Sequence, residues 1–387
     1  MRSGCAGHRR FAATAEDSLI AAFALPGLLA IPINQKPCQF SMTPLSSTIS
    51  GPNTVFFQRA LERQTQLTKP PGSLGELEAI AVRLCALQGR EQPRLENIHV
   101  SIFAADHGIA AEGVSAFPQA VTAEMVKNFA AGGAAVNVLA RHLRARFEVV
   151  DTGLLQALEL PNVIAHRAGC GTENFLHRPA MTADQLQMAL NAGRSAITRA
   201  QDSRADIFIG GEMGIANTTS ASAMATALLH VRACDITGAG TGLNARQIDH
   251  KTRIIEQALA FHQAHLHAPL DILQQLGGFE IAALVSAYLT AAQQGLPVLI
   301  DGFISSVAAL IASRIAPDCR SWFFYGHHSA EKGHKIVLQA LNAVPILNLH
   351  MRLGEASGAL LAVPIMQMAC RLHNEMATFS QANITTG

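Results

Sequence analysis

Short runs of β-branched and aromatic residues alternate with longer alanine-rich or amphipathic stretches along most of the chain. The short runs predict strands at 99–104, 147–150, 207–209, 297–300, 322–325 and 346–349. Because the stretches between them are long enough for helices, the pattern is typical of a doubly wound, mainly parallel α/β sheet of the Rossmann-like kind.

Glycine and acidic residues follow most of these strands at once. The segments are Asp106-His107-Gly108, Asp151-Thr152-Gly153, Gly210-Gly211-Glu212 and Asp301-Gly302. Parallel α/β sheets bind ligands at the carboxyl ends of their strands. We therefore expect a ligand site at this edge of the sheet, with Asp106, Gly210, Gly211, Glu212 and Asp301 as candidate contacts.

Residues 69–76, KPPGSLGE, predict the start of a helix before the sheet. Prolines precede it, Ser73 serves as N-cap, and Glu76 completes a capping box three residues later. The helix should run to about Gln88 and stop at Gly89.

Composition narrows the classes of protein. The chain has 387 residues, 49% of them hydrophobic and 15% charged, with a net charge of +1. That length suggests one large domain with a smaller appendage. A near-neutral chain without a basic run argues against nucleic-acid binding, which needs Lys and Arg to offset phosphates.

The cysteines are dispersed and form no C-x-x-C pair: Cys5, Cys38, Cys85, Cys170, Cys234, Cys319 and Cys370. Neither a zinc site nor a disulfide framework is indicated, and we expect a reducing, cytoplasmic setting.

The first residues allow two interpretations. Arg2, Arg9 and Arg10 precede an uncharged, mostly apolar stretch at 19–33, as in a signal peptide, but no small-x-small cleavage site follows. We favour the alternative, an extension upstream of a functional chain that begins at Met42. No other segment has the ~20 apolar residues that a membrane span needs, so no membrane contact is expected.

Glu355 is the strongest catalytic candidate. It lies in MRLGEASGALLAVPI (351–365), between Gly354 and Gly358, and a long uncharged run follows. Apolar surroundings raise the pKa of a carboxylate toward the useful range for a general base. The competing interpretation is a glutamate in the first turn of a helix, where it interacts with the helix dipole.

The second strong motif is IFIGGEMGIANTTSASAMATALL (207–229), a glycine-rich turn between a strand and an alanine-rich helix. Exposed N–H groups and hydroxyls at a helix N-terminus favour an anion such as phosphate. Its candidate contacts are Gly214, Asn217 and Thr218. The alternative is a tight connection that needs glycine for packing. Gly240, in DITGAGTGLN, offers a second backbone cradle, which Lys251 would complement.

Two further segments carry candidates. Asp106 and His107 form either a catalytic or a structural pair, and Phe117 and Met125 are candidates for a flat apolar pocket or for the core. GHHSAEKGH (326–334) carries three histidines, but adjacent histidines project differently, so metal binding is disfavoured. We expect no metal and no cofactor.

Several segments together resemble the nicotinate-nucleotide–dimethylbenzimidazole phosphoribosyltransferase family. They are KPPGSLGELE, ADHGIAAEGVSAFPQAVT, GGEMGIANTT, GAGTGL, QLGGFE, GLPVLIDGF, HSAEKGH and MRLGEASGA, in the order and approximate spacing of that family. The resemblance covers roughly 50–380.

The resemblance implies transfer of a phosphoribosyl group from nicotinate mononucleotide to 5,6-dimethylbenzimidazole, which gives α-ribazole 5′-phosphate and nicotinate. It implies Glu355 as general base, ligand contacts at Glu212, Gly214, Lys251 and Ser329, and Phe117 in the base pocket.

The family fold also implies a homodimer in which each chain has a large α/β domain (93–355) and a small helical domain built from both chain ends (42–92 plus 356–387). Residues 1–41 fall outside the resemblance.

Two other hypotheses remain. VVDTGL (149–154) is similar to the loop of phosphoribosyltransferases that use a pyrophosphoryl donor, but it has one acid where those enzymes have an adjacent pair for Mg²⁺. A non-catalytic nucleotide sensor would need the phosphate cradle and no base at 355.

Overall fold

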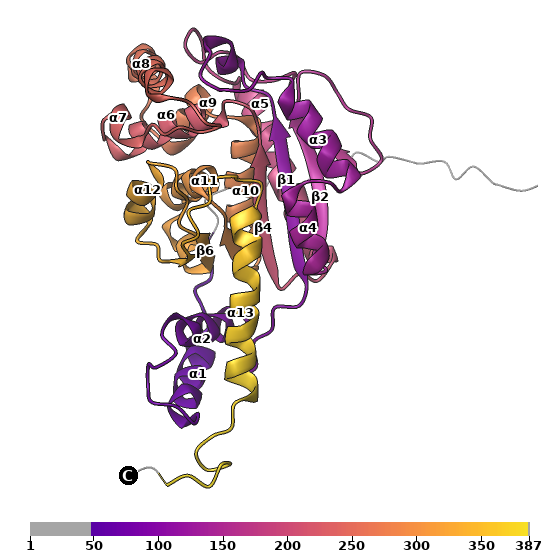
Figure 1. The fold of residues 1–387 in the computed structure, drawn as a ribbon, viewed down its shortest axis with the longest axis vertical. Coiled ribbons are helices and arrows are strands. Elements are labelled where there is room, and N and C mark those ends of the chain that lie inside the picture. The colour runs from indigo at the N-terminus through magenta and orange to yellow at the C-terminus, as the bar shows by residue number, and fades with distance from the viewer. Residues whose placement is uncertain (1–47, 386–387) are drawn as a thin grey trace, which may run out of the picture. The chain divides into compact units, whose positions relative to one another are not determined.

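A computed structural model describes residues 48–385, and its centre is one parallel sheet in the order β3-β2-β1-β4-β5-β6-β7 (Figure 1). The strands are β1 (Ile98–Ala105), β2 (Arg146–Gly153), β3 (Val163–Ala165), β4 (Ile207–Met213), β5 (Val298–Ile300), β6 (Phe323–His327) and β7 (Pro345–Leu347). Every neighbouring pair is parallel, which confirms the predicted fold class.

Helices connect the strands and cover both faces of the sheet. They are α1 (Thr54–Gln66), α2 (Glu76–Gln88), α3 (Val121–Ala131), α4 (Ala135–His142), α5 (Ala183–Asp202), α6 (Asn217–Leu229), α7 (Ala233–Ile236), α8 (Ala245–His262), α9 (Pro269–Leu276), α10 (Phe279–Gln293), α11 (Phe303–Ile315), α12 (His334–Leu341) and α13 (Ser357–Glu375). Helices α4 and α13 pack on one face, and α5 and α10 on the other (Figure 1).

Two consecutive glycines of β4 allow helices on both faces to pack close to the strand. Successive strand residues point to opposite faces of a sheet. A Cβ on Gly210 would lie 2.5 Å from Leu284 Cδ2 of α10, and one on Gly211 would lie 2.8 Å from the backbone nitrogen of Ala356, just before α13. The glycines therefore let a helix approach the strand from each side.

All six predicted strands are present, with two differences in detail. β3 was not predicted, since it is a three-residue edge strand that is only partly buried. β4 continues to Met213, so Gly210, Gly211 and Glu212 lie within the strand instead of after it. Glu212 is paired with Phe103 of β1, which places it at the carboxyl edge of the sheet.

The predicted start of α2 was wrong and its end is confirmed. The N-cap is Gly75, which has a φ of 54° and no side-chain cap. Ser73 does not cap the helix, because the turn that precedes α2 is held by Glu78 instead. The Glu78 carboxylate accepts the Leu74 N–H at 3.0 Å and pairs with Lys69. The helix ends at Gln88, as expected, and the residue that stops it, Gly89, is left-handed.

Both ends of the described chain meet in a small group of helices. α1 packs on α2, and α2 packs on α13. Gln64 on α1 bonds to His373 on α13 at 2.8 Å, and Leu67 forms an antiparallel bridge with Thr378. α13 also packs on β6 and α4, so it belongs to both groups. The domain boundaries at 92 and 356 stay a prediction. The predicted N-terminal extension, 1–41, lies outside the described residues.

No helix between residues 48 and 385 is long and apolar enough to cross a membrane.

Candidate active site

A cavity of about 430 Å³ opens at the carboxyl ends of the central strands. Its wall contains many of the predicted site residues: Phe117, Met125, Glu212, Gly214, Asn217, Thr218, Gly240, Ser329 and Glu355. These positions span more than half of the sequence, and the sheet brings them together as the strand-end pattern predicted.

Glu355 lies in an unusual turn at the edge of the cavity. Gly354, Glu355 and Ala356 have φ angles of 82°, 60° and 61°, and α13 begins at the next residue, Ser357. The left-handed region costs non-glycine residues roughly 1–3 kcal/mol each and persists where the surroundings enforce it. The Ser357 N–H and hydroxyl both donate to the Gly354 carbonyl, which closes the turn.

The carboxyl group of Glu355 is in a setting suited to a proton acceptor. The residue is 6% exposed, and burial raises its pKa to about 7, with a further contribution from the charge of Asp301. A base whose pKa lies near the working pH combines an adequate ionised fraction with adequate proton affinity.

Glu212, whose Oε1 would lie 2.5 Å from a Cβ on Gly354, is beside the Glu355 turn and has a different electrostatic setting. Burial raises its pKa well above the usual range, and the nearby carboxyls of Glu280, Asp301 and Glu355 add to this effect. The Asn217 side-chain amide donates a hydrogen bond to it and opposes the shift. Two carboxyls in one cavity with different pKa values can take different roles. Glu212 is suited to a neutral hydrogen-bonding acid and Glu355 to a base.

A polar corner lies on the α6 side of the cavity. Thr218, in the first turn of α6, accepts a hydrogen bond from Lys251 Nζ at 2.8 Å. Lys251 is only 1% exposed, and burial lowers its pKa to about 8. Arg352 donates to the Gly240 carbonyl at 2.9 Å. Hydroxyl, amide and cationic groups at a helix N-terminus form a site for an anion.

Gly240 requires its glycine. Its φ is 52°, and a Cβ there would lie 2.8 Å from Thr218 Oγ1 and 3.3 Å from Lys251 Nζ. Any side chain would fill the polar corner. Glu331 completes the corner, and burial raises its pKa while Lys251 and Arg352 oppose that shift.

Another part of the cavity wall is apolar. Phe117 is 52% exposed, and the side chains of Val121, Met125, Ile215 and Leu353 line the same region. The segment that carries Phe117 is tied to the glycine loop: Thr241 Oγ1 accepts the Ala116 N–H and lies 3.0 Å from Ser115 Oγ. The apolar wall and the polar corner are thus joined by direct hydrogen bonds.

Some predicted contacts lie outside the cavity wall. Gly210 and Gly211 pack against helices, as described above, which is the packing alternative for these glycines. Lys251 lies one layer behind Thr218. Asp301 accepts the Ala359 N–H at 2.7 Å instead of facing the cavity.

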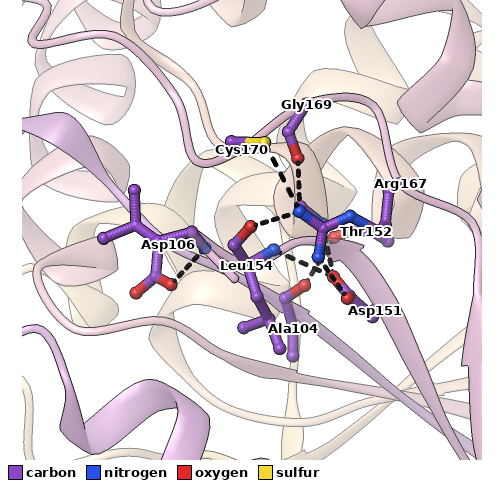
Figure 2. Close-up of polar contacts among 10 residues, drawn as sticks. Ala104, Asp106, Asp151, Thr152, Leu154, Arg167, Gly169 and Cys170 are labelled. Carbon is purple, nitrogen blue, oxygen red and sulfur yellow. Dashed lines mark hydrogen bonds and ion pairs between the residues drawn. The ribbon is translucent and has the colours of Figure 1, made fainter. Parts of the chain in front are cut away.

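Asp106 and the neighbouring Asp151 are held in backbone contacts (Figure 2). Asp106 Oδ2 accepts the Leu155 N–H at 2.8 Å. Asp151 pairs with Arg167 at 2.8 Å, and its other oxygen accepts the N–H groups of residues 153 and 154. The single acid of the 149–154 loop therefore stabilises its own turn, which disfavours the pyrophosphoryl-donor hypothesis.

His107 and His334 also have structural contacts within the protein. His107 pairs with Glu280 at 2.7 Å, and neither side chain is exposed. His334 Nδ1 accepts the N–H of Ser329, and its Nε2 lies 2.9 Å from Ser306 Oγ. His334 therefore positions the Ser329 segment of the cavity wall. Among residues 48–385, no three or more His, Cys, Asp or Glu side chains are grouped to hold a metal ion.

Sequence reasoning missed several wall residues, chiefly Val121, Ile215, Thr241, Glu331 and Arg352. All five lie in segments that were singled out for other residues, and the polar ones, Thr241, Glu331 and Arg352, could have been found there. Val121 and Ile215 could not, because an apolar residue in a wall and one in a core have the same pattern.

Comparison with known proteins identifies the family. A family model described as phosphoribosyltransferase matches residues 49–384. The nicotinate-nucleotide–dimethylbenzimidazole phosphoribosyltransferase of Pseudomonas syringae pv. syringae (strain B728a) is 56% identical over 327 residues, which are 84% of this chain and 93% of that protein. The Azotobacter vinelandii protein of the same name is 57% identical over 327 residues, with the same coverage.

A crystal structure of the phosphoribosyltransferase of that name from Thermus thermophilus matches with a TM-score of 0.81 and 41% identity, and the match covers 87% of this chain and 100% of that one. These findings confirm the resemblance seen in the sequence motifs, and the chain belongs to the nicotinate-nucleotide–dimethylbenzimidazole phosphoribosyltransferase family.

Proposed function

We propose that the cavity catalyses transfer of the 5-phosphoribosyl group of nicotinate mononucleotide to 5,6-dimethylbenzimidazole, with Glu355 as general base. The products are α-ribazole 5′-phosphate and nicotinate. The observation that carries the proposal is the buried carboxyl of Glu355, with its raised pKa, in a cavity that has an anion-binding corner and an apolar wall.

The reaction needs one proton acceptor. The bond between C1′ of the ribose and the nicotinate nitrogen breaks, and its electron pair stays on that nitrogen, which neutralises the positively charged ring. A benzimidazole nitrogen attacks C1′ from the opposite face, so the β bond becomes α. The other ring N–H then becomes acidic, and Glu355 takes this proton. Alignment of the two rings supplies much of the remaining acceleration.

The polar corner is suited to the phosphate. We assign the phosphate to the first turn of α6 at Thr218, the Gly240 backbone and Ser329, with Lys251 behind Thr218 as the cation. The benzimidazole then lies against Phe117, where a flat apolar ring covers exposed aromatic surface. Glu212, with its raised pKa, lies near the reacting centre as a neutral hydrogen-bond donor.

The assembly and location are proposed from the family resemblance. We propose a homodimer, which light scattering on the purified chain would test. We also propose that the protein acts in the cytoplasm, which cell fractionation would test.

One assay separates the competing functions. The protein is incubated with nicotinate mononucleotide and 5,6-dimethylbenzimidazole, and the products are separated by chromatography. We expect free nicotinate and α-ribazole 5′-phosphate in equal amounts, with activity retained in a chelator. A nucleotide sensor would bind the mononucleotide and release no nicotinate. An enzyme of the pyrophosphoryl-donor class would need phosphoribosyl pyrophosphate and Mg²⁺ and would lose activity in the chelator.

A further inference from the structure

Asp301 directs its carboxylate at the segment that follows Glu355. The residue comes directly after β5, is 1% exposed and does not line the cavity. Its Oδ1 accepts the Ala359 N–H at 2.7 Å, and the backbone N–H groups of Ala356 and Gly358 lie near enough to lower the pKa of the carboxyl group. One side chain therefore faces three amides within four residues and holds the last of them by a hydrogen bond.

These amides belong to the start of α13. The first N–H groups of a helix have no partner within the helix and need one from elsewhere. Here the N-cap residue is Ala356, whose side chain cannot accept a hydrogen bond. The carboxylate of Asp301 supplies this function from a different strand end, so it fixes the start of α13 to the end of β5.

The backbone at this point requires such support. Gly354, Glu355 and Ala356 are all left-handed, and two of them are not glycine. Left-handed residues of this kind persist where surrounding contacts enforce them. Close packing contributes as well, since a Cβ on Gly358 would lie 2.0 Å from His327 Cδ2.

We propose that Asp301 is a positioning residue: by accepting the first amide hydrogens of α13, it holds the left-handed turn that presents Glu355 to the cavity. The inference rests on the proposed role of Glu355 as the base. Asp301 does not line the cavity, so it would act through Glu355.

The charge of Asp301 has a second consequence for the same residue. A negative charge nearby disfavours ionisation of a carboxyl group and raises its pKa. The pKa of Glu355 is raised first by burial and then by Asp301. Other titratable or charged groups lie near this pair. Glu212 on β4 interacts with both carboxyls, Tyr288 on α10 interacts with Asp301, and His327 on β6 lies 3.8 Å from Asp301. Glu280 on α10 lies near Glu212, Glu331 and Arg352 share the cavity wall with Glu355, and Lys251 lies near Glu331.

Two substitutions separate the hydrogen bonds from the charge. Asp301→Asn keeps an oxygen that can accept the amides and removes the charge. Asp301→Ala removes both. Asp206→Asn is the matched control: Asp206 is a buried carboxylate that accepts the N–H groups of Glu96 and Asn97 at the other end of the sheet. We expect the control to leave kcat and its pH dependence unchanged.

In Asp301→Ala we expect kcat to fall by about 10²-fold, the lower end of the contribution of a positioned base, with little change in nucleotide affinity. Asp301→Asn should recover most of that loss. It should also move the pH-dependent limb of kcat to lower pH, since loss of a nearby negative charge lowers the pKa of Glu355. If Asp301→Ala fails to fold, the pH profile of Asp301→Asn still tests whether Asp301 acts on Glu355.

A double substitution tests the route of action. If Asp301 acts through Glu355, Asp301→Ala added to Glu355→Gln should cause no further loss of kcat. Additive losses would overturn the inference, and so would a folded Asp301→Ala enzyme with wild-type kcat or an Asp301→Asn enzyme whose pH limb does not move. A fully active Glu355→Gln enzyme would instead overturn the proposed base itself, so the two failures are distinguishable.

Discussion

Lys251 Nζ donates a hydrogen bond to the Thr218 hydroxyl over 2.8 Å, and only Thr218 of the two lines the cavity. Because its oxygen accepts from the ammonium group, the hydroxyl hydrogen is free to point into the cavity. The buried cation therefore polarises a neutral donor at the cavity wall, where a phosphate oxygen can accept from it.

Thr218→Val should weaken binding of nicotinate mononucleotide. Valine keeps the size and removes the hydroxyl, which also leaves Lys251 without its partner. A lost hydrogen bond of this type costs about 1.5–3 kcal/mol, or roughly 10- to 100-fold in affinity. Calorimetric titration with the nucleotide measures the effect. Thr252→Val is the control, since Thr252 donates to the Ile248 carbonyl of its own helix. Equal affinities in both variants would place the phosphate elsewhere.

Glu355→Gln should reduce kcat by about 10²- to 10⁴-fold, the typical contribution of a general base, with the nucleotide still bound. The base acts when ionised, so wild-type kcat should rise with pH through about 7 and then level off. That limb should be absent in the variant. Steady-state rates from pH 5 to 9 measure both effects. A near-normal kcat would falsify the assignment, and Glu212 would become the next carboxyl to test.

The same substitution should stabilise the fold at alkaline pH. The pKa of Glu355 is about 7 in the folded chain and 4.5 without its surroundings. Between these values the folded state binds more protons than the unfolded state, so stability falls as pH rises through this window. Glutamine removes the effect and should add about 3 kcal/mol to the free energy of unfolding at pH 8, with little change at pH 4. Denaturant titrations at both pH values check this, and equal gains at both would contradict it.

Phe117→Ala should weaken benzimidazole binding and spare the nucleotide. Covering a phenylalanine side chain contributes about 1.5–3 kcal/mol, so we expect KM for the base to rise roughly 10- to 100-fold. Phe261→Ala on α8 is the control, because Phe261 is similarly exposed and lies outside the cavity wall. A raised KM for the nucleotide alone would reverse the assignment of the two walls.

Gly214→Val should destabilise the fold, so it is a poor probe of the phosphate site. A Cβ at this position would lie 2.6 Å from the Ala105 carbonyl and 3.1 Å from His107 Cδ2. Overpacking of this kind costs about 1–3 kcal/mol. A lowered Tm should therefore accompany any loss of nucleotide affinity. An unchanged Tm with weakened binding would restore Gly214 as a direct ligand contact.

Much of the site could be predicted because chain order and sheet geometry act together. Glycine and acidic residues after strands gather at one edge of a parallel sheet, so Glu212, Asn217 and Thr218 meet Glu355 even though their sequence positions are far apart. The direction of the pKa shift of Glu355 could also be anticipated, since the uncharged run after it forms helix α13, whose first residues are buried.

What could not be predicted depends on contacts between distant segments. Gly210 and Gly211 have the composition of a phosphate loop, and only the positions of Leu284 and Ala356 make them packing glycines. Asp301 follows a strand and precedes a glycine, as a ligand contact would. Only the placement of α13 shows that it caps a helix. Ser73 matches a capping box, yet Glu78 and Lys69 hold that turn.

Helix α13 begins two residues after Glu355, and its other end is anchored to α1 and α2. His373 contacts both Gln64 and Cys85, and Leu67 pairs with Thr378 just beyond the helix. Local opening of one part of a fold spreads to whatever is packed on it as a cooperative unit. The amides of α1, α2 and α13 should therefore exchange hydrogen with solvent together. The lifetime of the turn that holds Glu355 would then be set by fluctuations of a helical layer that lies outside the cavity wall.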